Sequence, residues 1–289
     1  SYQQESPFFL PVYEFFRTFA SNRLNDSVLF VFIAAKFEQK MIFIDSLATF
    51  GKYCLFTKRV FSIPDRWAVF GKRTVGEVSK LGIDSIPLVL VISVFIGAVI
   101  AIQMQLNTTS PLIPAYSVGL ATRDIVLLEF SNSILCLILA GKVGSNIASE
   151  IGTMRVTEQI DALEIMGVNS ANYLVLPKIV AFVLFMPILV ILCMGTSIVG
   201  GYLVAVFTDI ITVSKYVYGL QAMFIEWYVW YGLIKSLFFA FIIASVASFY
   251  GYYVKGGALD VGKASTDGVV SSSILILLFD VILTKLLLQ

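Results

Sequence analysis

Five long apolar stretches, separated by shorter polar ones, dominate the chain from residue 86 onwards. A helix that crosses the hydrocarbon core of a membrane needs about 20 predominantly apolar residues, and each stretch is close to this length or exceeds it. The stretches cover residues 86–102, 125–148, 179–207, 227–254 and 269–288. The pattern therefore predicts an all-α integral membrane protein with about five transmembrane helices.

The first 84 residues follow a different pattern, in which apolar side chains recur at helical spacing between basic ones. Leu47 and Phe50 belong to one such series, and Trp67 begins another. Helices with one apolar and one basic face are typical of the membrane interface. We therefore predict N-terminal interfacial amphipathic helices over residues 1–84 and a membrane domain over residues 85–289. Ordinary soluble helices packed on one another are the alternative for the first region.

The composition agrees with lipid as the solvent and excludes several classes of function. Hydrophobic residues make up 58% of the 289 and charged residues 13%, against about 45–50% and about 25% in soluble proteins. The formal net charge of +1 gives no sign of nucleic-acid binding. The chain has no histidine and three widely spaced cysteines, which removes the commonest general base and metal ligand. We expect no catalytic residue, no metal site and no nucleic-acid partner.

The distribution of basic residues predicts the orientation of the chain in its membrane. If the N-terminus lies inside, sixteen of the twenty Lys and Arg residues fall in inside regions. The other four are Arg123, Lys215, Lys235 and Lys285. Because basic residues are retained on the inner side, we predict an N-terminus in the cytoplasm or stroma and a C-terminus on the opposite side.

Small residues recur at three- and four-residue spacing near the end of the second predicted span. They are Gly141, Gly144, Ser145 and Ala148. Small side chains at this spacing allow two membrane helices to approach closely. We therefore predict that these four residues mediate helix packing or dimer formation.

A short amphipathic helix is predicted directly after these residues, over positions 153–167. Thr153 or Thr157 is expected to cap its start, and Gly167 is expected to end it. Its two faces are formed by Val156, Ile160 and Leu163 on the apolar side and by Glu158, Asp161 and Glu164 on the acidic side. On the predicted orientation this helix lies in the cytoplasm, where its shape suits a groove on a soluble partner. A plain surface helix that joins two spans is the alternative.

Three ionisable residues fall inside the predicted spans: Glu129, Lys235 and Asp280. A charge at the centre of a bilayer costs about 2.5–3.5 kcal/mol on insertion scales, so such residues usually face a cavity or a partner. Glu129 and Lys235 are therefore candidates for contact with a ligand, and a structural ion pair between them is the alternative. For Asp280 we expect a structural role, with a hydrogen bond to Ser or Thr on a neighbouring helix.

The segment AGKVGSNIASEIGTMRVTEQIDALEIMGVN, residues 140–169, closely resembles the signature of MlaE/YrbE-type permeases. This family includes bacterial lipid-asymmetry transporters and the chloroplast TGD permease. GYYVKGGALDVGKASTDGVVSSSILILLFDVILTKLL, residues 251–287, is similar to the C-terminal block of the family. LIKSLFFA at 233–240 and FIGAVIAIQ at 95–103 fit as well. The resemblance extends over about residues 70–288.

This resemblance implies a homodimeric permease of an ABC-type transporter for phospholipid or a lipid similar to phosphatidic acid. It further implies a separate ATPase that carries ATP and Mg, an MCE-domain lipid-binding partner, and no cofactor in this chain. Residues 153–167 resemble the coupling helix, whose ATPase-docking residues would be Arg155, Val156, Glu158, Gln159, Ile160, Asp161, Leu163 and Glu164. Glu129 and Lys235 would lie near a lipid cavity between protomers, where we expect them to contact the lipid headgroup.

The sequence departs from the family in one motif. Many members carry RELGP near the start of the second span, where this chain has Leu128, Glu129, Phe130, Ser131 and Asn132. Only the glutamate is shared, so the polar role of the arginine does not carry over to Leu128. We expect this difference to affect the preferred headgroup.

Other interpretations of the sequence remain open. A proton-driven secondary transporter would use Glu129 and Asp280 and would show inverted repeats, and a membrane scaffold would transport nothing. GALDVGKA, residues 257–264, nearly matches a phosphate-binding loop, but Ala264 replaces the Ser or Thr that holds magnesium. We therefore expect no ATPase site in this chain. The plastid inner envelope is the favoured location, with a bacterial inner membrane as the alternative.

Overall fold

The computed structural model describes residues 47–64, 66–108, 114–208 and 211–288. The chain divides into two compact units, Ser1–Leu55 and Phe56–Gln289. In the first unit residues 47–55 are helical, and the interfacial helices predicted for residues 1–46 lie outside the described part. The boundary predicted after residue 84 rests on the change of sequence pattern and stays a prediction. Everything below concerns the second unit.

Five helical segments of the second unit are long and apolar enough to cross a membrane, which confirms the predicted fold class and the number of spans. They are Trp67–Asn107, Ser117–Val156, Ser170–Phe207, Trp227–Tyr252 and Ala258–Leu288. Four of them begin earlier than the apolar stretches do. They do so because helical turns with polar residues precede the apolar stretch in the same helix.

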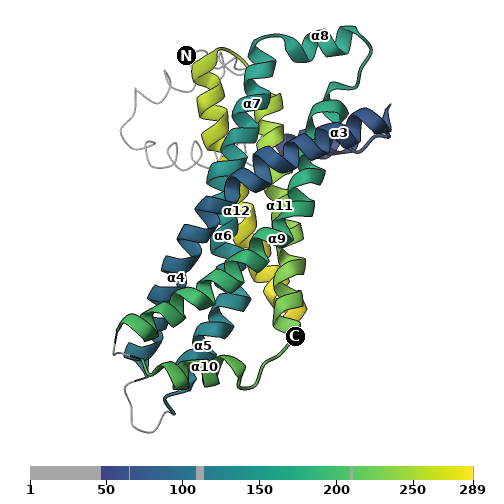
Figure 1. Cartoon of the computed structure of the whole chain (residues 1–289). Helices are drawn as coiled ribbons and strands as arrows, with labels where there is room; N and C mark the ends of the chain where they lie inside the picture. The colour runs from purple at the N-terminus through teal and green to yellow at the C-terminus, as the bar shows by residue number, and fades with distance from the viewer. Residues whose placement is uncertain (1–46, 65, 109–113, 209–210, 289) are drawn as a thin grey trace, which may run out of the picture. The chain divides into compact units, whose positions relative to one another are not determined.

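The first segment combines an amphipathic helix with a spanning helix. α3 (Trp67–Glu77) leads through a π-helical turn, Val78–Gly82, and a 3-10 turn, Ile83–Ser85, into α4 (Ile86–Asn107). Figure 1 shows α3 crossing the other helices while α4 runs along them. The predicted helix that begins at Trp67 is therefore present, and the irregular turns after it allow the chain to change direction.

The second segment is one long helix with two irregular stretches. It consists of α5 (Ser117–Ile125), a π-helical stretch Val126–Ile134, α6 (Leu135–Leu139), a second π-helical stretch Ala140–Gly144, and α7 (Ser145–Val156). π-helical turns are rare and occur frequently at functional sites. Glu129 lies in the first of these stretches and Lys142 in the second.

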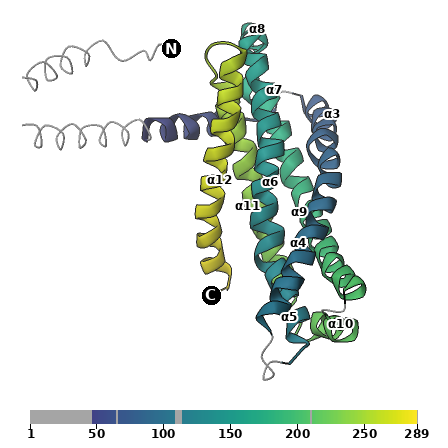
Figure 2. The same ribbon diagram turned by 90° about the vertical axis from the view of Figure 1, so that its left-hand side faces the viewer.

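The remaining segments pack beside this helix. α8 (Gln159–Ile165) joins it to α9 (Ser170–Phe207), and α10 (Val213–Gln221) occupies part of the region expected to be a loop. α11 (Trp227–Tyr252) and α12 (Ala258–Leu288) pack against each other and against α7 (Figure 2). Residues 258–264 form the first turns of α12, so the near-match to a phosphate-binding loop is the start of a helix.

α4 and α9 are in contact through their backbones. A Cβ added at Gly97 would lie 1.8 Å from the carbonyl oxygen of Ser197, and one added at Gly200 would lie 2.1 Å from that of Val94. Real Cβ atoms do not approach an oxygen this closely, so both positions require glycine. The contact thus depends on two glycines that face each other's helix, as is common between membrane helices.

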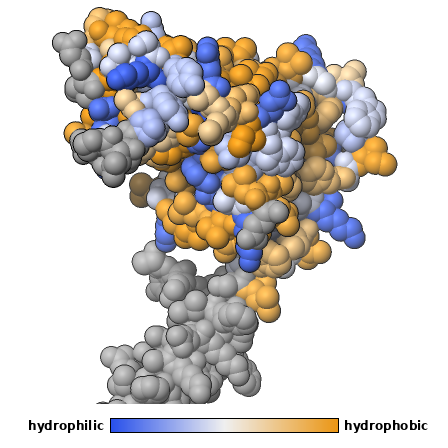
Figure 3. Space-filling view, turned by 90° about the horizontal axis from the view of Figure 1, so that it is seen from below, coloured by the Kyte–Doolittle hydropathy of each residue, from blue (hydrophilic) through white to orange (hydrophobic). Residues whose placement is uncertain are grey.

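Apolar side chains also cover the outside of the second unit. Val91, Phe95 and Val99 form a stripe along α4 in which each residue is more than half exposed. Figure 3, seen from the end that carries α5 and α10, shows hydrophobic and hydrophilic side chains interspersed. Apolar surface of this extent is expected where helices contact lipid or another membrane subunit.

Candidate functional site

The predicted coupling helix is shorter than the sequence suggested. α8 begins at Gln159, and Glu158 before it adopts a left-handed conformation with φ of 60°. Arg155 and Val156 belong to the end of α7, so their assignment to the same helix as Glu164 was wrong. A non-glycine residue with positive φ is uncommon, and nothing in the sequence around Glu158 indicates the break.

The ends of α8 only partly follow the predicted capping. No side chain caps the start of α8, and the hydroxyls of Thr153 and Thr157 instead donate to the backbone oxygens of Ser149 and Thr153. The predicted cap by either threonine was therefore wrong. Gly167 follows the helix with φ of 77°, and this left-handed residue ends it as expected.

Glu164 fixes α8 to the membrane domain. Its Oε1 accepts hydrogen bonds from the hydroxyls of Ser170 on α9 and Tyr252 on α11, each at 2.8 Å. The guanidinium of Arg59 lies 2.8 Å from the same oxygen. Ile160 on the inner side is completely buried. Glu164 and Ile160, which were predicted to dock a partner, therefore hold α8 in place.

The attachment of α8 is expected to weaken at acidic pH. The hydrogen bond from Ser170, followed by that from Tyr252, lowers the pKa of Glu164 below 4.5. A carboxyl group with a lowered pKa contributes stability above its unfolded pKa and loses it as pH falls through the folded pKa. Hydrogen exchange of the amides of residues 159–165, corrected for the intrinsic exchange rate at each pH, should therefore accelerate as the pH falls through the lowered pKa of Glu164. In Glu164→Gln it should be fast already at neutral pH, and a wild-type rate in this variant would contradict the attachment.

The exposed tip of this region is apolar. Ile165 and Met166 are 87% and 68% exposed, Gln159 is exposed as well, and Leu163 is half-buried. Asp161 is paired with Arg155 at 2.6 Å. The sequence analysis missed Ile165 and Met166, although two apolar residues directly before a helix-ending glycine are a usable signal. The surface that α8 offers to a partner is thus more apolar than predicted.

A buried ionic network lies next to α8, on the side of the spanning helices. The sequence did not indicate it. Lys178 on α9 is 3% exposed and lies 2.9 Å from Glu77 Oε2 and 2.8 Å from Glu150 Oε2. Glu150 also lies 3.5 Å from Lys80. These contacts connect α3, α7 and α9. The network thus includes the part of α7 that precedes the turn into α8.

Lys235 lies at the centre of a polar cluster within the membrane domain. Its Nζ atom is 2.5 Å from Asp280 Oδ1 and 3.4 Å from Glu129 Oε2, and the side chain is completely buried. It also donates hydrogen bonds to the hydroxyls of Tyr231 at 2.7 Å and Thr284 at 3.1 Å. The cluster joins α11, α12 and the first π-helical stretch.

The cluster brings together all three ionisable residues predicted within the spans. The hydroxyl of Ser133 lies 2.8 Å from Asp280 Oδ1 and 3.1 Å from Glu129 Oε2, which confirms the bond predicted for Asp280. The Glu129–Lys235 ion pair, which was the alternative to headgroup contact, is present. The Glu129 side chain is nevertheless 41% exposed, and its role in headgroup contact stays a prediction.

Three of the four small residues contribute to packing within the protomer. Gly144 lies against Ile243 and Val269, and the backbone oxygen of Ser145 accepts a hydrogen bond from Ser265. A Cβ at Gly251 would lie 2.6 Å from the backbone oxygen of Ala148. Gly141 faces open space. Gly144, Ser145 and Ala148 thus lie in contacts between helices of the protomer, and the role of the four residues in helix packing or dimer formation stays a prediction.

Two cavities in the described part of the chain lie away from the polar cluster. One, of about 320 Å³, lies beside α5 and α10 and is lined in part by Arg123, Phe224 and Met194. The other, of about 450 Å³, lies between α3 and the turn from α8 to α9. Neither is lined by Glu129 or Lys235. The lipid cavity expected beside these two residues stays a prediction.

Comparison with known proteins agrees with this architecture. Residues 74–286 match the family model described as permease MlaE. A probable ABC transporter permease protein of Rickettsia bellii is 35% identical over 240 residues, which are 82% of this chain and 91% of the relative. A similar protein of Synechocystis is 32% identical over 75% of this chain and 82% of its own length. The chloroplastic protein TRIGALACTOSYLDIACYLGLYCEROL 1 of Arabidopsis thaliana is 28% identical over 75% of this chain and 62% of its own.

The matched region contains the irregular turns that follow α3, most of each of the five apolar spans, α8 and the polar cluster around Lys235. It covers well over half of the chain. The expected family is thereby confirmed: the chain belongs to the MlaE permease family of ABC transporters.

Proposed function

We propose that this chain is the membrane subunit of an ATP-driven lipid transporter and that a separate ATPase docks on α8. The observation that carries the proposal is the position of α8. It is fixed by Glu164 to α9 and α11, it continues from α7, and it presents the exposed side chains of Ile165 and Met166. A short helix with a rigid base and an apolar tip suits a groove on a soluble partner.

We also propose that the cargo is a lipid and that the chain has further partners. The name of the Arabidopsis relative refers to a galactolipid, which supports a lipid as cargo. An MCE-domain protein would receive or deliver this lipid, and two copies of the chain would enclose the cavity that Glu129 borders. The bacterial and chloroplast relatives support a plastid inner envelope or a bacterial inner membrane, and we retain the former as the favoured location.

Purification of the full chain from its native membrane in mild detergent tests this proposal. Mass spectrometry of the purified sample should identify an ABC ATPase, an MCE-domain protein and a glycerolipid. Recovery of the chain as a dimer with no ATPase would contradict the proposal and favour a secondary transporter or a scaffold.

Substitution at the tip of α8 should uncouple the ATPase from the permease. Ile165→Asp together with Met166→Asp places two charges where an apolar contact is expected, and unpaired charge at such a contact is costly. We expect at least a tenfold loss of ATPase co-purification, since a loss of about 1.4 kcal/mol already gives this factor. The control is Lys263→Gln, an exposed position near the start of α12 and outside α8, which should retain the ATPase. Equal recovery in both variants would show that the tip is not the docking surface.

A further inference from the structure

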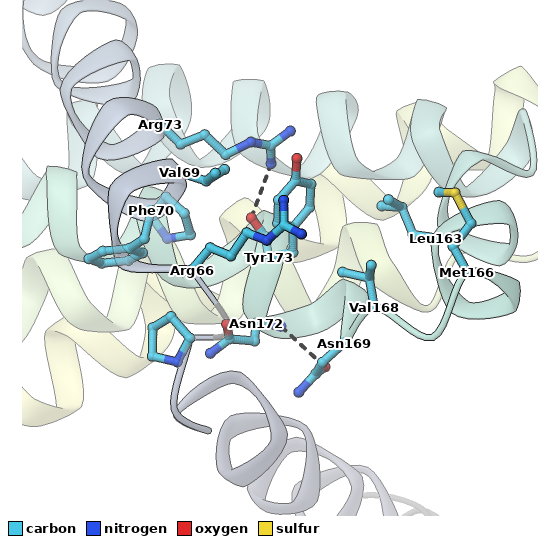
Figure 4. A pocket seen from close by; sticks show the side chains of 12 residues that line it. Arg66, Val69, Phe70, Arg73, Leu163, Met166, Val168, Asn169, Asn172 and Tyr173 are labelled. Carbon is cyan, nitrogen blue, oxygen red and sulfur yellow. Dashed lines mark hydrogen bonds between the residues drawn. The ribbon is translucent and has the colours of Figure 1, made fainter.

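The cavity between α3 and the turn from α8 to α9 has a distinctive lining. Figure 4 shows Arg66 and Arg73 of the α3 region gathered around Tyr173 of α9, with Leu163 and Met166 on the opposite side. The remaining lining residues are Pro64, Val69, Phe70, Val168, Asn169, Asn172 and Pro177. Its walls are mostly apolar, and no acidic side chain is among the described residues that line it.

The two arginines differ in how they are held. The guanidinium of Arg73 lies 3.7 Å from the centre of the Tyr173 ring and donates a hydrogen bond to the Tyr173 backbone oxygen at 3.0 Å. An arginine has five N–H donors in a rigid fork, so this bond leaves most of them available. Arg66 is exposed, and the described residues offer its side chain no hydrogen bond or ion pair. The cavity thus contains one oriented and one unengaged guanidinium.

The carboxylates near the cavity that belong to the described residues are paired with other basic side chains. Glu164 is bound by Arg59, and Asp161 is paired with Arg155. Glu77, one helical turn beyond Arg73 on α3, is paired with Lys178. Among the described residues no carboxylate is paired with Arg66 or Arg73, and guanidinium groups bind phosphate in particular.

The cavity also lies at the depth of the lipid headgroups. Lys178 is the last charged residue of α9 before the uncharged stretch 179–207, and its pairing with Glu77 places α3 at the same level. Tyr173 is little more than one turn further out on α9. The cavity therefore opens where the hydrocarbon region ends and phosphates of the inner leaflet begin.

We propose that this cavity binds an anionic phospholipid from the inner leaflet, with its phosphate on Arg66 and Arg73 and its glycerol ester region against the apolar walls. A free phosphate would leave those walls exposed to water, which is why we favour a lipid. The site does not include Glu129 or Lys235 and lies between α3 and the turn from α8 to α9. A bound lipid would contact both α3 and the turn from α8 to α9. It would therefore affect how α8 is held in place.

Photocrosslinking in nanodiscs tests this site in the full chain. The nanodiscs consist of phosphatidylcholine with a small fraction of photoactivatable phosphatidic acid, and labelled peptides are mapped by mass spectrometry. We expect labelling within residues 66–73 and 163–177. Arg66→Gln should reduce it about tenfold, the effect of one lost charge-assisted contact. Lys72→Gln, which removes the same charge from an exposed position of α3 outside the cavity, should change it less than twofold.

Each other outcome contradicts the proposal. An equal loss of labelling in Arg66→Gln and Lys72→Gln would indicate diffuse attraction to the membrane surface. Unchanged labelling in Arg66→Gln would exclude the arginine contact. Equal labelling by photoactivatable phosphatidylcholine would exclude selection for anionic lipid. Complete displacement by millimolar inorganic phosphate would identify a site for free phosphate. Displacement only by the purified ATPase would identify a protein-docking surface. None of these results depends on whether the chain transports lipid.

Discussion

Lys235→Met should be the most destabilising single substitution in the membrane domain. The lysine is completely buried and is paired with Asp280 at 2.5 Å and Glu129 at 3.4 Å. Methionine has a similar shape but leaves two carboxylates close together without a counter-charge. Removal of one partner from a buried ion pair typically costs about 3–5 kcal/mol. We therefore expect a large drop in thermal stability and in the yield of folded protein in detergent.

Two further variants separate the charge effect from a loss of packing. The triple variant Lys235→Met, Glu129→Gln, Asp280→Asn removes the charges together and should recover most of the stability, because an uncharged cluster needs no counter-ion. Lys255→Met, at an exposed position beyond α11, should have little effect. If the triple variant is no more stable than the single one, the three residues do not form the ionic cluster described here.

Gly97→Ala should disrupt the contact between α4 and α9. The added methyl group would lie 1.8 Å from the backbone oxygen of Ser197, and backbone atoms cannot move aside as a flexible side chain can. The two helices must then separate, and overpacking of this kind costs about 1–3 kcal/mol or more. The loss is measurable as a lower melting temperature in detergent.

The matched control is Gly195→Ala on α9 itself. A Cβ at Gly195 has nothing within 4 Å, and alanine favours a helix over glycine by about 0.5–1 kcal/mol. This variant should be as stable as the wild type or more so. If the two substitutions have the same effect, α4 and α9 do not approach through their backbones.

The five spans could be predicted because each contains a long apolar stretch that only a membrane helix satisfies. The end of α8 at Gly167 was predictable as well, since glycine is the usual residue with positive φ there. The start of α8 was not, because the left-handed residue is Glu158, a type that gives no such signal. The extension of the helices beyond their apolar stretches could not be predicted either, because polar helical turns do not stand out in the hydrophobic pattern.

The residues of the polar cluster around Lys235 could be predicted, but the contacts between them could not. Glu129, Lys235 and Asp280 could each be identified because a charge inside the bilayer carries a high free-energy cost. Their assembly around Lys235 depends on how three helices pack, and the residues are more than 40 positions apart in the chain. For the same reason the ionic network of Lys178 and the cavity at Arg73 could not be predicted. Both form only when α3 lies against α9.

Reconstitution of the chain into liposomes together with its ATPase tests the central claim most directly. Transfer of a fluorescent phospholipid between these liposomes and a soluble MCE-domain acceptor is measured with ATP, without ATP, and with the Ile165→Asp, Met166→Asp variant. The account predicts ATP-dependent transfer by the wild type and none above the ATP-free rate by the variant. Transfer that is equally fast without ATP, or unaffected by the variant, would contradict an ATP-driven permease coupled through α8.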